Sequence, residues 1–252
     1  MNPRNRYLAV HGRKPVLEAL RDPELRIAKV LVADDARGPA LEPVLTEAKR
    51  RGVTIERTRE SRLNAVARTS RHQGVVADVI APNLAGLGEF CERRRGGRAH
   101  RTAVLVLDGV TTPANVGMVL RSATAAGIEG VVVPEAGTAE LGPLVIKASA
   151  GVAFRSPIVR SATTAEALDA LADERFEIVG LDTHPDAVDL FAAPLPERVA
   201  FVVGNEASGL SPEARERVGA YRSIPLAAGV ESLNVACAAT LVAYEITRRR
   251  TA

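Results

Sequence analysis

The chain has 252 residues, of which 46% are hydrophobic and 25% are charged, so it can bury one large core or two modest ones and is not a disordered chain. No apolar run approaches the ~20 residues of a membrane span, and residues 1–10 lack the apolar stretch of a signal peptide, which predicts a cytoplasmic protein. Its two cysteines, Cys91 and Cys237, lie far apart, and no Cys or His spacing typical of a metal site accompanies them. We therefore expect no metal and two ordinary free thiols, with Cys237 buried in an apolar helix.

Charge is distributed unevenly along the chain. Residues 1–83 carry 16 Lys and Arg against 10 Asp and Glu, residues 84–101 carry 5 against 2, and residues 102–252 carry 12 against 18. A basic N-terminal part joined to an acidic C-terminal part favours a polyanionic partner for the N-terminal part. Arginine-rich surfaces are also found where they only increase solubility. With only 3% aromatic residues and no Trp, the composition favours shape and backbone contacts to structured RNA over base stacking.

Residues 1–83 predict a small α/β unit. Apolar periodicity predicts helices over residues 13–20, 40–51 and 61–68, and strands over residues 28–33, 53–56 and 74–80. The segment 84–101 (LAGLGEFCERRRGGRAHR) contains glycines and a block of arginines before the next apolar run. This composition predicts a basic linker between two domains.

Residues 102–252 predict a second α/β unit of alternating strands and helices. Strands are predicted over residues 103–107, 130–133, 156–159, 177–181, 199–203 and 221–224. Helices are predicted over residues 116–126, 142–148, 164–172, 212–219 and about 232–249, with a short helical piece near 186–191. Repeated strand–helix units indicate a mostly parallel sheet covered by helices on both faces. The arginines of the tail 248–250 are expected to be solvated.

The first motif is residues 108–127 (DGVTTPANVGMVLRSATAAG), directly after a predicted strand. Asn115 stands where the following helix begins, and because Asn is a favoured N-cap it has a purely structural explanation. Arg121 lies about two turns further on, among apolar and small residues, where a guanidinium needs an anionic partner or a solvated position. A surface arginine is the structural alternative for Arg121.

The second motif is residues 201–210 (FVVGNEASGL), which places Gly204 and Glu206 in one turn between a strand and a helix. Glycine permits close backbone approach. The carboxylate between the glycines is the more specific feature, although an acidic side chain near a helix N-terminus is also stabilising by roughly 0.3–1 kcal/mol.

The third motif is residues 224–238 (IPLAAGVESLNVACA). Ser232 is a candidate N-cap of the last helix. Asn234 is predicted to lie one turn into that helix, in an apolar setting where a buried amide needs a partner.

The three motifs, in this order, resemble the SpoU/TrmH branch of the SPOUT RNA methyltransferases, which transfer a methyl group from S-adenosylmethionine to a ribose 2′-hydroxyl. The resemblance implies a SPOUT domain over residues 102–252 with a deep C-terminal trefoil knot, a feature that periodicity does not reveal. The segments HGRKPVLEAL and RHQGVVA resemble the L30e-like substrate-binding domain of many SpoU members, which assigns residues 1–83 to RNA binding. Family members are dimers, so the resemblance implies a homodimer.

The resemblance also implies roles for individual residues. The residues expected to be catalytic are Asn115, Arg121, Glu206, Ser232 and Asn234, and those expected to bind S-adenosylmethionine are Gly204, Ile224 and Leu233. In the family the arginine contacts the target's phosphate and activates the ribose hydroxyl, and the acidic residue organises the pocket. No separate strong base is present, which fits a mechanism dominated by positioning the hydroxyl in line with the sulfonium methyl.

The substrate class is inferred from the N-terminal domain, residues 1–83. By resemblance, an L30e-like domain favours 23S ribosomal RNA over tRNA, and a tRNA 2′-O-methyltransferase is the alternative within the family. A non-catalytic RNA-binding protein that retains the fold is a second alternative, which the intact motif residues disfavour. A nucleotide-binding enzyme of the doubly wound type is a third, but the chain has no G-x-G-x-x-G after its first strands and no P-loop.

Overall fold

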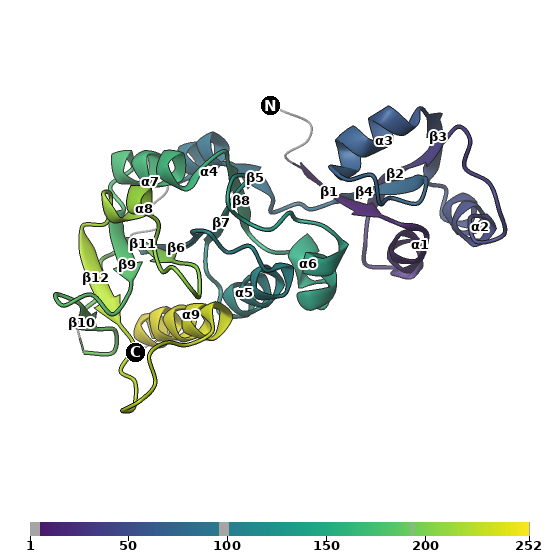
Figure 1. Ribbon diagram of the computed structural model, residues 1–252. Coiled ribbons are helices and arrows are strands. Elements are labelled where there is room, and N and C mark those ends of the chain that lie inside the picture. Colours follow the sequence, from purple (N-terminus) through teal and green to yellow (C-terminus); the bar gives the residue numbers. More distant parts are fainter. Residues whose placement is uncertain (1–5, 96–100, 193, 252) are drawn as a thin grey trace.

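The computed structural model describes residues 6–95, 101–192 and 194–251, which form two α/β units, each built on its own sheet (Figure 1). The N-terminal unit has a four-stranded sheet of order β1-β4-β2-β3, in which β4 pairs antiparallel with β1 and β2 while β2 pairs parallel with β3. Its elements are β1 (Tyr7–His11), α1 (Arg13–Arg21), β2 (Ile27–Ala33), α2 (Glu42–Arg50), β3 (Thr54–Thr58), α3 (Glu60–Ala67) and β4 (Val75–Ile80). The sequence prediction omitted β1 and placed the other six elements within a few residues.

The two segments that carried the substrate-binding resemblance meet at one end of this sheet. The Arg13 backbone N–H donates to Gln73 Oε1 at 3.0 Å, and Arg13 Nε donates to the Gln73 carbonyl at 3.2 Å. His72 is buried; its Nδ1 accepts from the Gly74 N–H at 3.0 Å and its Nε2 lies 2.9 Å from Asn64 Oδ1. Arg13 and Gln73 therefore tie the start of α1 to the turn before β4, and His72 ties the same turn to α3.

The C-terminal unit has an eight-stranded sheet of order β10-β12-β9-β11-β6-β7-β8-β5, in which every recorded pairing is parallel. Its strands are β5 (Ala85–Gly86), β6 (Thr102–Leu107), β7 (Gly130–Pro134), β8 (Ile158–Ser161), β9 (Glu177–Leu181), β10 (Val188–Asp189), β11 (Arg198–Val203) and β12 (Ala220–Ser223). Its helices are α4 (Leu87–Arg95), α5 (Pro113–Ala125), α6 (Pro143–Ala148), α7 (Thr164–Asp173), α8 (Pro212–Arg215) and α9 (Val235–Thr251), with a 3₁₀ turn at Val152–Phe154.

Helices cover both faces of this sheet, as the alternating units predicted. Successive side chains of a strand point to opposite faces, so Leu105 and Leu107 join the core beneath α5 and α9, while Val104 and Val106 join the core beneath α4 and α7. Figure 1 shows these two helical layers on opposite sides of the strands. The central strand β6 is buried on both faces, which explains why every residue after Thr102 is apolar.

Several sequence expectations differ from the structure. The expected linker 84–101 is structured over residues 85–95 as β5 and α4, because Leu87, Phe90 and Cys91 recur at helical spacing and are buried; residues 96–100 lie outside the described residues. The expected helical piece at 186–191 contains the short edge strand β10. Cys237 is exposed.

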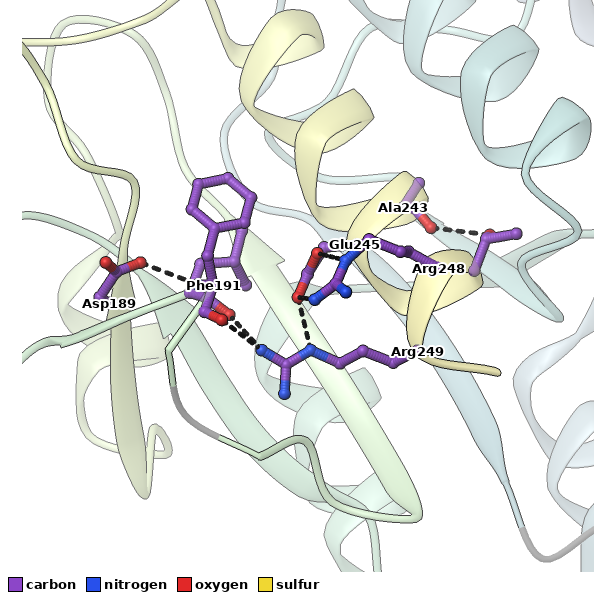
Figure 2. Close-up of polar contacts among 8 residues, drawn as sticks. Asp189, Phe191, Ala243, Glu245, Arg248 and Arg249 are labelled. Atoms are coloured by element: carbon purple, nitrogen blue, oxygen red, sulfur yellow. Dashed lines mark hydrogen bonds and ion pairs between the residues drawn. The ribbon is translucent and has the colours of Figure 1, made fainter. Parts of the chain in front are cut away.

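The expectation of a solvated arginine tail holds only for Arg248, whose side chain is 62% exposed, and is wrong for Arg249 and Arg250. Arg248 and Arg249 bind the buried Glu245 of the same helix, and Arg250 pairs with Glu129 at 2.9 Å. Figure 2 shows the first two contacts, together with the bonds from Arg249 to backbone carbonyls near β10. Within the described part of the chain, no helix is both long and apolar enough to cross a bilayer.

Candidate active site

The three sequence motifs converge at the carboxyl edge of the eight-stranded sheet. The first follows β6, the second follows β11, which pairs directly with β6, and the third follows β12, which β9 separates from β11. Because parallel strands end at the same edge, loops far apart in the chain meet there.

A hydrogen-bond chain joins one residue from each motif. Asn234 Nδ2 donates to Asn115 Oδ1 at 3.1 Å and also to Glu206 Oε1. The same Glu206 oxygen accepts from the Val235 N–H at 3.3 Å. Three side chains from three motifs are thus held in one arrangement, which we call the Asn115–Asn234–Glu206 cluster.

Asn234 occupies a different position from the one expected. Helix α9 begins at Val235, and Asn234 Oδ1 accepts from the Ala236 and Cys237 N–H groups at 3.0 and 3.4 Å, so Asn234 caps the helix and Ser232 does not. Its amide oxygen accepts from the N–H groups of the helix, and its amide nitrogen donates to Asn115 and Glu206. These opposite roles fix the orientation of the side chain.

Asn115 is likewise not a cap. Helix α5 begins at Pro113 after Thr112, and Asn115 lies in its first turn, where it is only 5% exposed. A buried amide in a helix needs a side-chain partner, and Asn234 provides it. The purely structural explanation as an N-cap is therefore wrong.

A cavity of about 240 Å³ opens beside the cluster, between the ends of β9, β11 and β12. Gly204, Ile224 and Leu233, the three expected cofactor-binding residues, all line it, as do the expected catalytic residues Glu206 and Ser232. Its acidic lining residues are Asp182, Glu206 and Glu231, and no Lys or Arg lines it among the described residues.

Gly204 is required by the turn that forms one wall of this cavity. Asn205 and Gly209 exchange two backbone hydrogen bonds of 2.9 Å, which bring the Gly209 backbone against Gly204. A Cβ on Gly204 would lie 2.4 Å from the Gly209 carbonyl carbon. The close backbone approach predicted for Gly204 is therefore present, and the backbone that approaches it is that of Gly209 in the same turn.

Two further residues that sequence reasoning did not single out hold the motifs together. The buried carboxylate of Asp108, at the end of β6, accepts from the Ser211 N–H at 2.6 Å, just before α8. Asn205 Nδ2 donates to the Gly109 carbonyl at 2.8 Å. A carboxylate directly after the apolar end of a strand was the available signal for Asp108. Asp182, directly after β9, is the third omission, and the same signal, a carboxylate that follows an apolar strand, was available for it.

Arg121 lies apart from the cluster. It is exposed on α5, and its guanidinium makes no hydrogen bond or ion pair with another described residue. It stands six residues, about 9 Å of helix, beyond Asn115 and on a different face. The structure therefore brings four expected catalytic residues to the cavity or the cluster beside it and leaves Arg121 on the surface.

Comparison with known protein families gives two matches that together span most of the chain. Residues 102–244 match the sequence profile of the SpoU rRNA Methylase family. Residues 9–85 match the profile described as RNA 2′-O ribose methyltransferase substrate binding. The two matched segments correspond to the two α/β units.

Individual relatives match over the full length. The chain is 33% identical over 250 residues to the 23S rRNA (guanosine-2′-O-)-methyltransferase RlmB of Xanthomonas axonopodis pv. citri, a match that covers 99% of each protein. It is 34% identical over 254 residues to the protein of the same name from Xylella fastidiosa, covering 100% of this chain and 99% of that protein. Among solved structures, the SpoU methyltransferase AviRb of Streptomyces viridochromogenes in complex with AdoMet matches with a TM-score of 0.63 and 26% identity, covering 98% of this chain and 92% of AviRb.

Proposed function

The chain belongs to the SpoU rRNA Methylase family, and from this premise we propose that it transfers the methyl group of S-adenosylmethionine to a ribose 2′-hydroxyl of 23S ribosomal RNA. The observation that carries the proposal is the Asn115–Asn234–Glu206 cluster, which stands beside an acidic cavity at the carboxyl edge of a parallel sheet. Full-length relatives that bear the name of a 23S rRNA (guanosine-2′-O-)-methyltransferase support the substrate.

The cavity suits this cofactor. S-adenosylmethionine carries a positive sulfonium and an ammonium group, and Glu206 and Glu231 give the wall the opposite charge. The third acidic residue of the wall, Asp182, is paired with Arg215 at 2.9 Å. Leu181, Ile224, Leu226 and Leu233 supply an apolar surface for the adenine ring. We assign Gly204, Ile224 and Leu233 to cofactor binding. When bound, the cofactor supplies the reactive methyl group.

The chain's own residues position the substrate. We assign Asn115 to holding the target ribose, with Asn234 fixing the Asn115 amide and Glu206 fixing Asn234. Ser232, exposed at the rim of the cavity, completes the proposed methyl-transfer site. Such preorganisation favours methylation without a strong base, since an oriented hydroxyl reacts more readily than a free one, and the hydroxyl proton passes to water at the open rim of the cavity.

Arg121 is assigned to the phosphate of the target nucleotide, and its exposure leaves the guanidinium available for that contact.

An apolar surface lies beside Arg121, which is one helical turn from Met118, a residue that is 40% exposed. Helix α9 presents Leu241 and Tyr244 on its surface, and Ser122 of α5 bonds Thr240 of α9 at 2.8 Å, so the two helices form one partly apolar surface. We propose that this surface forms a homodimer interface.

Three finer points belong to the same proposal. The C-terminal segment forms the trefoil knot of the SPOUT family, the protein acts in the cytoplasm, and the N-terminal unit, which carries the basic excess of the chain, binds structured RNA. The segment from residue 84 to residue 101 joins the two units, although β5 and α4 within it pack on the C-terminal sheet.

The proposal is tested by transfer of labelled methyl from S-adenosylmethionine into separated, undermodified ribosomal RNA and tRNA. Label in 23S RNA at a linkage that resists alkaline hydrolysis is the expected result. Label in tRNA would support methyl transfer to RNA but reject 23S ribosomal RNA as the substrate. The variant Arg121→Ala should lose methyl transfer while keeping most cofactor binding, and full activity in it would reject the role of Arg121. An inactive wild type that binds RNA as well as the variant does would identify a non-catalytic RNA-binding protein.

A further inference from the structure

A second cavity, of about 760 Å³, lies between the two units. Its N-terminal wall comes from β1, β2, β4 and α3, and its C-terminal wall comes from the ends of β7 and β8 and from the loop 135–141. The Arg68–Glu135 ion pair, 2.8 Å long, crosses from one unit to the other at its edge.

This cavity lies on the same edge of the eight-stranded sheet as the candidate active site. From β11 to β8 is three strand spacings, roughly 14 Å at about 4.8 Å per strand. The loop that walls the cavity is bonded to the first motif, because the Ala139 N–H donates to the Val110 carbonyl at 2.9 Å. An RNA strand bound at the cluster could therefore extend along this edge of the sheet into the second cavity.

Of the four cationic side chains that line the cavity, three are already paired. Lys29 and Arg62 bind Glu56 at 3.1 and 3.5 Å, and Arg68 binds Glu135. The fourth, Arg160 at the end of β8, has no hydrogen bond or ion pair within the described residues, and its buried Nε lacks a partner.

The surroundings of Arg160 make this unpaired state costly. Burial lowers the pKa of its guanidinium, and the nearby positive charge of Arg68 lowers it further, while Glu135 and Glu140 act in the opposite direction without pairing with it. The Thr138 hydroxyl, which also lines the cavity, is buried without a partner. Arg160 is half-buried, and its buried Nε without a partner carries a desolvation cost that a hydrogen-bond acceptor from a ligand would offset.

We infer that this cavity is a second RNA-binding site, in which Arg160 binds a backbone phosphate of a nucleotide near the methylated one. The inference rests on the proposed function, since it requires an RNA substrate. A guanidinium matches the geometry of a phosphate, and the Thr138 hydroxyl is a second donor for the same group. The carboxylates of Asp78, Glu135 and Glu140 on the remaining wall restrict binding to a phosphate placed directly on Arg160.

The test compares Arg160→Gln, Arg160→Lys and Arg21→Gln with the wild type. Arg21 is an exposed arginine on α1, which lies on the opposite face of the N-terminal sheet from α3 and serves as the matched control (Figure 1). The affinity for an unmodified 23S rRNA transcript is measured as a function of salt, together with the affinity for S-adenosylmethionine and the melting temperature.

Arg160→Gln should weaken RNA binding by about tenfold to a hundredfold and reduce the slope of log K against log salt by about 0.7 to 0.9, the value for one phosphate contact. Its cofactor affinity should be unchanged and its melting temperature equal to or above that of the wild type, because the unpaired charge is gone. Arg160→Lys should restore the slope. Arg21→Gln should behave as the wild type.

Several outcomes would overturn the inference. Unchanged RNA affinity and slope in Arg160→Gln would reject it while leaving the proposed function intact, as would equal losses in Arg21→Gln. A lower melting temperature with weaker cofactor binding would show a structural role. Stabilisation of the wild type by inorganic phosphate, with RNA affinity unaffected in Arg160→Gln, would identify a site for free phosphate. A wild type that neither binds nor methylates RNA would reject the proposed function and this inference with it.

Discussion

Replacing Glu245 by Gln should cost the protein about 3 kcal/mol of stability at neutral pH. The Glu245 side chain is 3% exposed on α9, and its carboxylate accepts from Arg248 Nε and Nη2 at 2.8 Å each and from Arg249. These hydrogen bonds, with that of Arg248 the largest cause, outweigh burial and lower the pKa of Glu245 from 4.5 to about 2. A depression of that size corresponds to about 3 kcal/mol at roughly 1.36 kcal/mol per unit.

The same shift sets the pH dependence. Because the pKa of the folded state is depressed, the stabilisation is complete above the unfolded-state value of 4.5 and is lost as pH falls from there toward 2. Gln cannot ionise, so the gap between the wild type and Glu245→Gln should be widest at neutral pH and should close on acidification. Arg249 keeps its bonds to the Leu190 and Phe191 carbonyls, at 3.2 and 2.9 Å, in both proteins (Figure 2).

Thermal unfolding followed by circular dichroism measures the effect. A loss of about 3 kcal/mol corresponds to a fall in melting temperature of about 6–12 °C for a chain of this size. The control is Glu18→Gln, since Glu18 is 65% exposed and lies 4.0 Å from Lys14, a pair expected to contribute little. Equal melting temperatures for the wild type and Glu245→Gln at neutral pH, or a gap that stays constant down to acidic pH, would refute the reasoning.

Four further outcomes follow from the site. Asn234→Ala should abolish methyl transfer and remove about 1 kcal/mol of helix-cap stability, measured by activity and by urea unfolding; a variant as active as the wild type would contradict the cluster's role. Gly204→Ala places a Cβ 2.4 Å from the Gly209 backbone, so calorimetry should detect no S-adenosylmethionine binding, and normal affinity would show that the turn yields. Glu231→Gln should weaken cofactor binding about tenfold by removing a negative charge from the cavity, whereas unchanged affinity would exclude that carboxylate from the site. Tyr244→Glu should shift the protein from dimer to monomer in analytical ultracentrifugation, and a persistent dimer would place the interface elsewhere.

Part of the site was predictable because it depends on local chain geometry. Each of the three motifs follows a predicted strand of a parallel sheet, so their loops could be expected at one edge of that sheet. The choice of Gly204, Ile224 and Leu233 within those loops came from the family resemblance, and all three line the cavity. Their family resemblance added the cofactor, which no periodicity contains.

The amphipathic and alternating patterns of the chain by themselves determined the α/β class, the two-unit organisation and most element positions, since each depends on residues close in sequence. Short elements were missed where local signals compete: the arginines of α4 obscured the buried Leu87, Phe90 and Cys91 on its other face.

Only the tertiary structure decided which side chains meet. Asn115 and Asn234 are 119 residues apart, and each had a local explanation as a helix residue until strand order brought them within hydrogen-bond distance. The same holds for Arg160. Its position in a cavity between the N-terminal unit and the ends of β7 and β8, with no partner for its Nε, is a property of the folded chain alone. Pairing, burial and unpaired charge depend on contacts between distant segments, and the pattern of neighbouring residues carries no information about those contacts.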